Sequence, residues 1–325
     1  MQKTNGVRIY LIAAQIYLGA QNAAQSEKYL QKVFETEPDN ASVHLLYARL
    51  EAFRQNMDAM VGHYEKVLAS DPKQLVWQDL FILALQYLNA NQTEKFQQIF
   101  AQSRRDFPNA SGFHLLLAVK YLKEGNYASA YYEMLFEKEV GLTDAAYFKE
   151  AIQEIEKKFQ DAFQNRPAET WLFPLYQFIH GKQAYEKHDY PQAFAWIEQS
   201  LQREEHPLQS LYLGRALAGM GETDKAIGYY GKTLNKQEAF ALATAELAGL
   251  YLQKGVTEAA QNFWNKALSI DPQIANLSQV GTRLSELHMV LPMPKVSEAY
   301  TVKLTDNLMR VQLNQMILNS FSNAL

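Results

Sequence analysis

The chain has 325 residues, of which 48% are hydrophobic and 20% charged, a composition typical of a folded protein and not of a disordered one. Its formal net charge is -4 and no long run of lysine or arginine occurs, which argues against binding to nucleic acid. The sequence contains no cysteine, so disulfides, thiolate metal sites and cysteine nucleophiles are excluded. This lack is compatible with either an exported or a cytosolic bacterial protein.

A structural helix is expected at the N-terminus. In residues 1–21, Lys3 and Arg8 precede apolar residues that recur at helical spacing, and Gln15 interrupts them. A signal sequence would carry a continuous apolar block instead, so we interpret the chain as a processed form or an expressed fragment. The longest apolar runs, such as Leu80 to Leu85, are far shorter than the roughly 20 residues that span a bilayer, so no membrane span is expected.

From about residue 7 to 274, the chain repeats a pattern with a period close to 34 residues. Small residues recur at intervals of 34, 36, 34, 63, 33 and 34 residues, at Ala14, Ala48, Ala84, Ala118, Gly181, Gly214 and Ala248. Twelve positions after each comes a mostly small residue, and four positions further a mostly bulky one: Leu30, Tyr64, Phe100, Met134, Ile197, Tyr230 and Trp264. Prolines that would end a helix close several of the units, at Pro38, Pro72, Pro108 and Pro272.

This pattern resembles the tetratricopeptide repeat, a helix-turn-helix unit of 34 residues. The clearest unit is "TAELAGLYLQKGVTEAAQNFWNKALSIDP", which has Ala248, Gly255, Ala260, Trp264 and Pro272 in the family's places. The resemblance covers seven units. It implies an all-α, right-handed superhelical solenoid of about seven such repeats with a C-terminal helical cap.

The same phase divides the chain into four segments. We predict an N-terminal array of four repeats over residues 1–140, an irregular helical insertion or degenerate repeat over 141–173, a C-terminal array of three repeats over 174–274 and further helices over 275–325. A helix is expected from about Asn276 to Met289, and a last one from Ser297. The apolar face of the last helix is too wide to remain free in water. It caps the final repeat, folds back over the array, or docks on a partner or on a second copy of the chain.

The sequence offers no arrangement of residues for catalysis or metal binding. Its seven histidines form no recognisable ligand cluster, and His44 and His114 occupy positions of the family's first aromatic residue, which favours packing. The turn "KHDY" replaces a glycine turn, and we expect His188 to be exposed there. No nucleophilic serine motif or phosphate-binding loop occurs. We therefore expect no enzyme, no metal and no cofactor.

The resemblance implies that the first helices of the units line a concave groove that holds a partner. Applying the repeat phase gives the candidate groove residues Leu45, Arg49, Phe81, Leu85, Leu115, Val119, Phe178, Lys182 and Arg215. Some family members grip a C-terminal carboxylate with a clamp of basic and amide side chains. The clamp positions in this chain hold residues of other kinds, among them Leu46, Gln78 and Ile82, so that mode of binding is not expected.

These observations predict a scaffold or adaptor that binds another protein, through an amphipathic or hydrophobic segment of the partner. The resemblance and the lack of cysteine suggest a bacterial envelope, export or protease-adaptor complex, with a cytoplasmic setting as the alternative. Self-association through the C-terminal helix is a further option. The competing function is a regulatory receptor for a peptide or signal.

Overall fold

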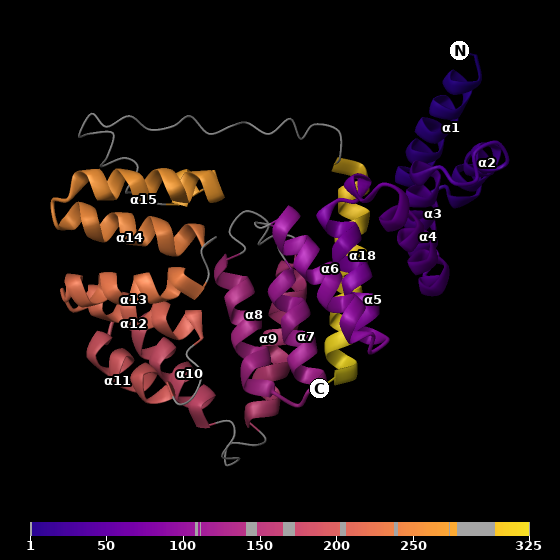
Figure 1. Ribbon diagram of the computed structural model, residues 1–325. Helices are drawn as coiled ribbons and strands as arrows, with labels where there is room; N and C mark the ends of the chain where they lie inside the picture. Colours follow the sequence, from indigo (N-terminus) through magenta and orange to yellow (C-terminus); the bar gives the residue numbers. More distant parts are fainter. Residues whose placement is uncertain are drawn as a thin grey trace. The chain divides into compact units, whose positions relative to one another are not determined.

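The computed structural model describes residues 2–107, 110, 112–140, 148–164, 173–201, 206–236, 240–272, 274–277 and 303–324. Within these ranges the chain forms helices and no β-strand, and most helices come in pairs (Figure 1). The predicted all-α class is therefore confirmed. The chain divides into two compact units, which we call unit 1 (Met1–Pro108 and Glu298–Asn323) and unit 2 (Asn109–Ser297 and Ala324–Leu325).

Seven helical hairpins in the described residues correspond to the seven sequence repeats. In unit 1 the hairpins are α1 (Gln2–Gly19) with α2 (Ala23–Phe34), α3 (Ala41–Phe53) with α4 (Met57–Ser70), and α5 (Trp77–Asn89) with α6 (Thr93–Asp106). A short 3-10 helix, η1 (Pro72–Gln74), precedes α5. In unit 2 they are α7 (Phe113–Lys123) with α8 (Tyr127–Val140), α10 (Phe173–Glu186) with α11 (Tyr190–Ser200), α12 (Pro207–Gly219) with α13 (Thr223–Lys236), and α14 (Ala241–Gln253) with α15 (Thr257–Ile270).

The turn within each hairpin has the same backbone conformation. A residue with positive φ stands seven positions after each small residue of the repeat, at Gln21, Gln55, Asn91, Gly125, His188, Gly221 and Gly255. Two hydrogen bonds close the turn: in the last hairpin Gly255 N donates to Leu252 O (3.0 Å) and Val256 N donates to Tyr251 O (2.9 Å). This is the Schellman ending of a helix. The prediction that His188 lies exposed in such a turn is confirmed.

The small and bulky repeat positions pack the two helices of each hairpin together. Both kinds are buried in most hairpins, as Ala248 and Trp264 are in the last one. A Cβ atom on Gly214 would lie only 3.0 Å from the ring of Tyr230, so this glycine permits the close approach of α12 and α13. Trp264 belongs to a buried hydrophobic cluster that also includes Ile274 of α16 (Ile274–Leu277), so it helps to fill the joint with the next element, as the repeat pattern predicts.

Unit 1 contains the C-terminal helix in addition to the first three hairpins. This helix, α18 (Lys303–Ala324), lies beside α5 in Figure 1, and Asn89 Nδ2 of α5 donates a hydrogen bond to Ser320 Oγ (3.0 Å). Among the alternatives for the last helix, the structure therefore corresponds to the one in which it folds back over the array.

Unit 2 begins before the boundary that the sequence phase predicts. The hairpin α7–α8 groups with the following helices because aromatic side chains of α8 pack against them. The ring of Tyr132 stacks on His206 at 5.3 Å between centroids, and Phe136 meets Phe240 edge-on at 5.1 Å. The repeat phase places the first four hairpins in one array that ends at residue 140. The compact units instead divide after Pro108, so the fourth hairpin belongs to unit 2.

Two other predicted segments lie partly outside the described residues. The insertion 141–173 contributes α9 (Lys149–Gln164), but residues 141–147 and 165–172 are not among those described. Of the helix predicted from Asn276 to Met289, the described part ends with α16 at Leu277. The start of the last helix at Ser297 also lies outside the described residues, and α18 is described from Lys303. Within the described ranges, no helix is long and apolar enough to cross a membrane.

Candidate partner-binding surface

The surface that receives α18 is formed by the first helices of the second and third hairpins. Leu313 and Gln312 of α18 line a small space of about 20 Å³ together with side chains of α3, α4 and α5. We call the surface under α18 the α3/α5 face and define it by Arg49, Ala52, Gln78, Ile82 and Asn89. α3 and α5 are the first helices of their hairpins, the elements on which the repeat phase predicts the groove.

One stripe of α18 is buried and the opposite stripe is exposed. Leu313, Ile317 and Phe321 are fully buried, and their spacing of four residues places them on one side of the helix. On the other side, Gln315 and Asn319 are exposed. The described part of α18 therefore buries a mainly apolar stripe against the chain and exposes the opposite stripe, which includes Val311.

Over residues 310–322, the part of α18 whose side chains the structure describes, Arg310 is the one charged residue. Residues 311–324 contain no Asp, Glu, Lys or Arg. Two buried polar side chains on this helix are hydrogen-bonded: Asn314 Nδ2 donates to Arg310 O (2.8 Å), and Ser320 Oγ donates to Met316 O (3.0 Å). The helix is thus suited to a surface that selects by shape and apolar contact more than by charge.

Arg49 on the α3/α5 face is held in place by a network inside unit 1. Its guanidinium makes a two-pronged ion pair with Asp79 of α5, with Nε to Oδ1 at 3.0 Å and Nη2 to Oδ2 at 2.7 Å. The hydroxyl of Tyr64 on α4 donates to Asp79 Oδ1 (2.8 Å), and the Asp79 carboxylate also accepts from Val76 N at the start of α5. Burial and the negative charge of Asp79 raise the pKa of Tyr64 well above its usual value.

The same network occurs once more, in unit 2. Arg215 of α12 pairs with Glu246 of α14 through Nε (3.0 Å) and Nη2 (2.8 Å), and Tyr230 of α13 donates to the same carboxylate (2.7 Å). In both cases the arginine and the tyrosine come from one hairpin and the carboxylate from the next. The network therefore joins successive hairpins, and the bidentate geometry gives it directional specificity.

The structure places the candidate groove residues in two environments. The apolar ones are buried, with exposures of 8% for Leu45 and 0% for Phe81, Leu85, Leu115, Val119 and Phe178. These side chains contact the chain itself, so in this conformation they offer no surface to a partner. The charged ones are partly exposed: Arg49 and Arg215 belong to the two networks, and Lys182 pairs with Glu186 on the same helix.

The α3/α5 face is only partly contained in that set of candidates. The repeat phase assigns Arg49 to the groove, and Gln78 and Ile82 occupy positions of the family's clamp. Ala52 and Asn89 are not singled out by any sequence pattern. Among the sequence patterns, the family's clamp positions therefore predict the location of this face best.

Unit 2 contains a buried cluster of two histidines around a carboxylate. His114 Nδ1 lies 2.6 Å from Glu133 Oε2, and His206 Nε2 lies 3.5 Å from Glu133 Oε1. Burial acts to raise the pKa of Glu133, but hydrogen bonds from both imidazoles outweigh it and lower that pKa to about 2. Because His206 Nδ1 accepts a hydrogen bond from Leu208 N, the neutral ring carries its proton on Nε2 and can donate to Glu133.

Unit 1 contains a second histidine pair, between α3 and α4. His44 Nδ1 and His63 Nδ1 are 2.9 Å apart, and the ring of Tyr47 stacks on His63. Burial lowers the pKa of both imidazoles, and the neighbouring His44 lowers that of His63 further. His44 is thus a packing residue, as its place in the repeat predicts.

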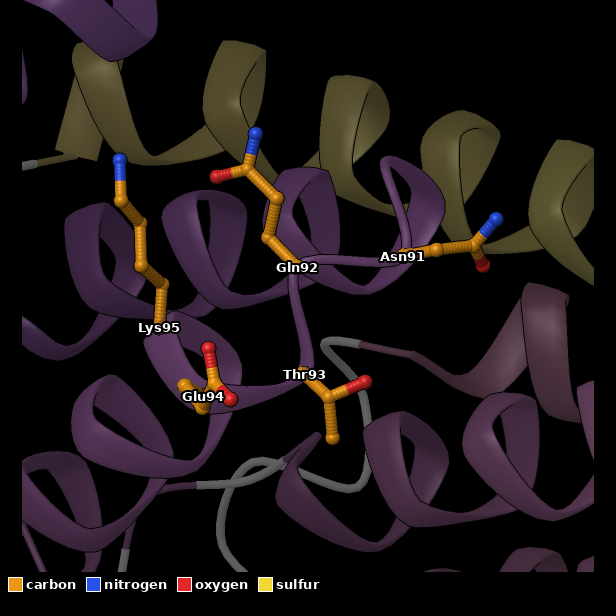
Figure 2. Close-up of a pocket in the computed structure, with 5 residues that line it drawn as sticks. All are labelled: Asn91, Gln92, Thr93, Glu94 and Lys95. Atoms are coloured by element: carbon orange, nitrogen blue, oxygen red, sulfur yellow. The ribbon is translucent and has the colours of Figure 1, made fainter.

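An open hollow lies at the turn between α5 and α6. It has a volume of about 410 Å³ and is lined by Asn91, Gln92, Thr93, Glu94 and Lys95, all of them exposed. Figure 2 shows that the side chains of Asn91, Gln92 and Thr93 point in different directions. Lys95 is engaged with Glu65 on α4 at 2.6 Å. This hollow lacks the convergent polar groups of a binding site.

Comparison with known proteins returned structural similarities. No protein-family model matches the chain, and no curated protein matches it. The chain is similar to the APC/C hetero-tetramer Cut9-Hcn1, with 18% identity over 85% of this chain and a TM-score of 0.37, and it spans 55% of the length of that chain. It is also similar to the P58(IPK) TPR domain, with 15% identity, coverage of 87% of this chain and 88% of that one, and a TM-score of 0.35. A tetratricopeptide repeat protein from Parabacteroides merdae has 13% identity, coverage of 86% and 99%, and a TM-score of 0.33.

The fold assignment rests on the hairpins themselves. Seven of them share one turn geometry, one pattern of small and bulky packing residues and one sequence period. The described residues therefore form an all-α array of helix-turn-helix repeats, the fold that the sequence pattern predicts.

Proposed function

We propose that this chain is a non-enzymatic protein-interaction scaffold, and that the α3/α5 face of unit 1 binds a helical segment of a partner protein. The observation that carries the proposal is the position of α18, because an amphipathic helix already lies against this face with Leu313, Ile317 and Phe321 buried. Helix-in-groove binding uses the same arrangement of apolar anchors on one side of a helix.

The α3/α5 face is suited to repeated use because its charged group is preorganised. Arg49 is paired with Asp79, which belongs to the chain's own hairpins and not to α18, so the pair does not need a group from the occupant. An arriving helix then need not supply a carboxylate, and the cost of ordering the surface is small. The bacterial envelope, export or protease-adaptor setting stays a prediction from the sequence, because the described residues do not bear on it.

The proposal is tested with a fluorescently labelled synthetic peptide of residues 303–324 and the full chain carrying Ile317→Glu and Phe321→Glu, which removes two anchors of the resident helix. We expect the peptide to bind this variant. Adding Ala52→Glu should weaken binding at least tenfold, because it places a charge on the α3/α5 face beneath the uncharged residues 311–324 of the helix.

The matched control is Gln97→Glu, which adds the same charge at an exposed position of α6. It should leave peptide binding unchanged, and circular dichroism should show all variants to be folded. If Ala52→Glu binds the peptide as tightly as Gln97→Glu does, the α3/α5 face is not the binding surface.

A further inference from the structure

The helix α18 lies where a partner helix is proposed to bind, and the question is whether it is a fixed part of unit 1 or an exchangeable occupant. The first two hairpins of unit 1 pack against each other through side chains that α18 does not supply. The hydrophobic cluster of the first two hairpins consists of Ala14, Leu18, Leu30, Leu46 and Leu50, all from α1, α2 and α3. The side chains that hold these hairpins together therefore do not come from α18.

The contact of α18 with the α3/α5 face combines buried apolar anchors with polar side chains. Leu313 and the side chains of α3 and α5 leave a small unfilled space between them. Arg49 and Gln78 lie at this space and Asn89 lies at the far end of the contact, so the face contains polar groups that tolerate water. Interfaces between separate partners likewise have an apolar centre and a polar edge.

The sequence of α18 defines the chemistry of whatever can replace it. Its anchors are Leu313, Ile317 and Phe321, at positions i, i+4 and i+8, and the small polar Ser320 at i+7 meets Asn89. Residues 311–324 carry no charge. A competing segment would be an uncharged amphipathic helix with large apolar residues at this spacing, and its binding would depend little on salt.

Resting on the proposed function, we infer that α18 is a self-ligand of the α3/α5 face, and that a partner helix of the same pattern must displace it to bind. Because α18 is part of the chain, its effective concentration at the face is high, and a free helix competes against it. The α3/α5 face is therefore occupied by α18 until a helix with higher affinity displaces it or α18 dissociates.

A reversible lock on α18 tests this inference directly. The chain has no cysteine, so Asn89→Cys with Ser320→Cys introduces a single pair at side chains that are in hydrogen-bond contact. The labelled peptide of residues 303–324 is titrated into the oxidised full chain and into the same protein after reduction. We expect the oxidised form to bind at least tenfold more weakly, and the reduced form to recover the affinity of the chain without the lock.

Two control variants separate the outcomes. Gln315→Glu with Asn319→Glu, on the exposed side of α18, should bind the peptide as the wild type does, whereas Ile317→Glu with Phe321→Glu should bind it at least tenfold more tightly. Equal binding by the oxidised and reduced forms would overturn the inference while leaving the proposed function intact. A disulfide-linked dimer as the main oxidised product would overturn it in favour of exchange between two copies. If the peptide binds neither the reduced form nor the released variant, the proposed function fails as well.

Discussion

At the scale of single residues, the two arginines that the sequence suggested for a partner are tied to neighbours within the chain. Arg49 and Arg215 each join a carboxylate of the next hairpin and a tyrosine of their own. The Asp79 side chain is fully buried, and Arg49 is the cation that pairs with it. The network is therefore expected to contribute to the stability of the stack as well as to shape the α3/α5 face.

Replacing Arg49 tests this contribution. We expect Arg49→Ala to lower the free energy of unfolding by about 3 kcal/mol, because it leaves a buried carboxylate without its cation. Tyr64→Phe, which removes one hydrogen bond, should cost about 1 kcal/mol. Urea denaturation measures both, and Arg105→Ala at an exposed ion pair should leave the midpoint unchanged. A midpoint for Arg49→Ala equal to that for Arg105→Ala would contradict the role of the network.

The Glu133 cluster predicts a particular dependence of stability on pH. The pKa of Glu133 is lowered from 4.5 to about 2 in the folded chain, so its contribution is complete above pH 4.5 and is lost as the pH falls toward 2. That contribution is on the order of 3 kcal/mol. The difference in unfolding free energy between the wild type and Glu133→Gln, followed by urea denaturation across pH, should therefore shrink below pH 4.5. A difference that stays constant down to about pH 3 would show that Glu133 is not held ionised by the two histidines.

The hairpin turns predict opposite effects at two equivalent positions. His188 and Gly255 both have positive φ, at 60° and 75°, which a side chain disfavours. We expect His188→Gly to raise the free energy of unfolding by about 0.5–1 kcal/mol and Gly255→Ala to lower it by about 1 kcal/mol. No atom lies within 4 Å of a Cβ built on Gly255, so any loss there comes from the backbone. Thermal melting of the two variants gives the comparison, and shifts of the same sign would contradict it.

At the scale of elements, the approach of paired helices depends on small residues at particular positions. A Cβ on Gly181 of α10 would collide with Ile197 of α11, whereas Gly228 of α13 has open space around it. Both residues lie within helices, so the helix-forming gain from alanine is the same at each. They differ only in what the added methyl group meets.

This difference gives a matched pair of substitutions. We expect Gly181→Ala to lower the free energy of unfolding by about 1–3 kcal/mol through overpacking. Gly228→Ala should raise it by roughly 0.5–1 kcal/mol, because alanine favours the helix. Urea denaturation of the two variants measures the contrast. Equal midpoints would show that α10 and α11 can move apart without loss of stability, which would contradict the role assigned to the small residues.

The hairpins were predictable from the sequence because their packing residues recur at a fixed period. The turns were harder to predict, because only three of them have a glycine at the position with positive φ: Gly125, Gly221 and Gly255. The other four hairpins have glutamine, asparagine or histidine there. The candidate groove residues show why phase alone does not find a surface. A first helix in a stack packs against its own partner and against the neighbouring hairpins, so positions such as Phe81 and Leu115 fall inside. Where the repeat phase puts a polar residue at such a position, as at Arg49, its side chain stays partly exposed.

At the scale of the whole molecule, the position of α18 could not be read from its sequence. Its apolar stripe requires a covering surface, but capping the last repeat, folding back and docking on a second chain bury the same side chains. The choice depends on the surface offered elsewhere, in this chain Ala52, Gln78 and Ile82. We propose that partners bind this same surface, so α18 and a partner helix would compete for it.

The central claim is that a partner helix takes the place of α18 on the α3/α5 face. Hydrogen exchange of the full chain, alone and with a saturating amount of the unlabelled 303–324 peptide, measures this directly, because amides of a displaced helix lose protection. We predict that amides of residues 310–322 in the chain exchange faster when the peptide is bound, while those of α3 and α5 remain protected. Bound peptide with unchanged protection of residues 310–322 would contradict the account.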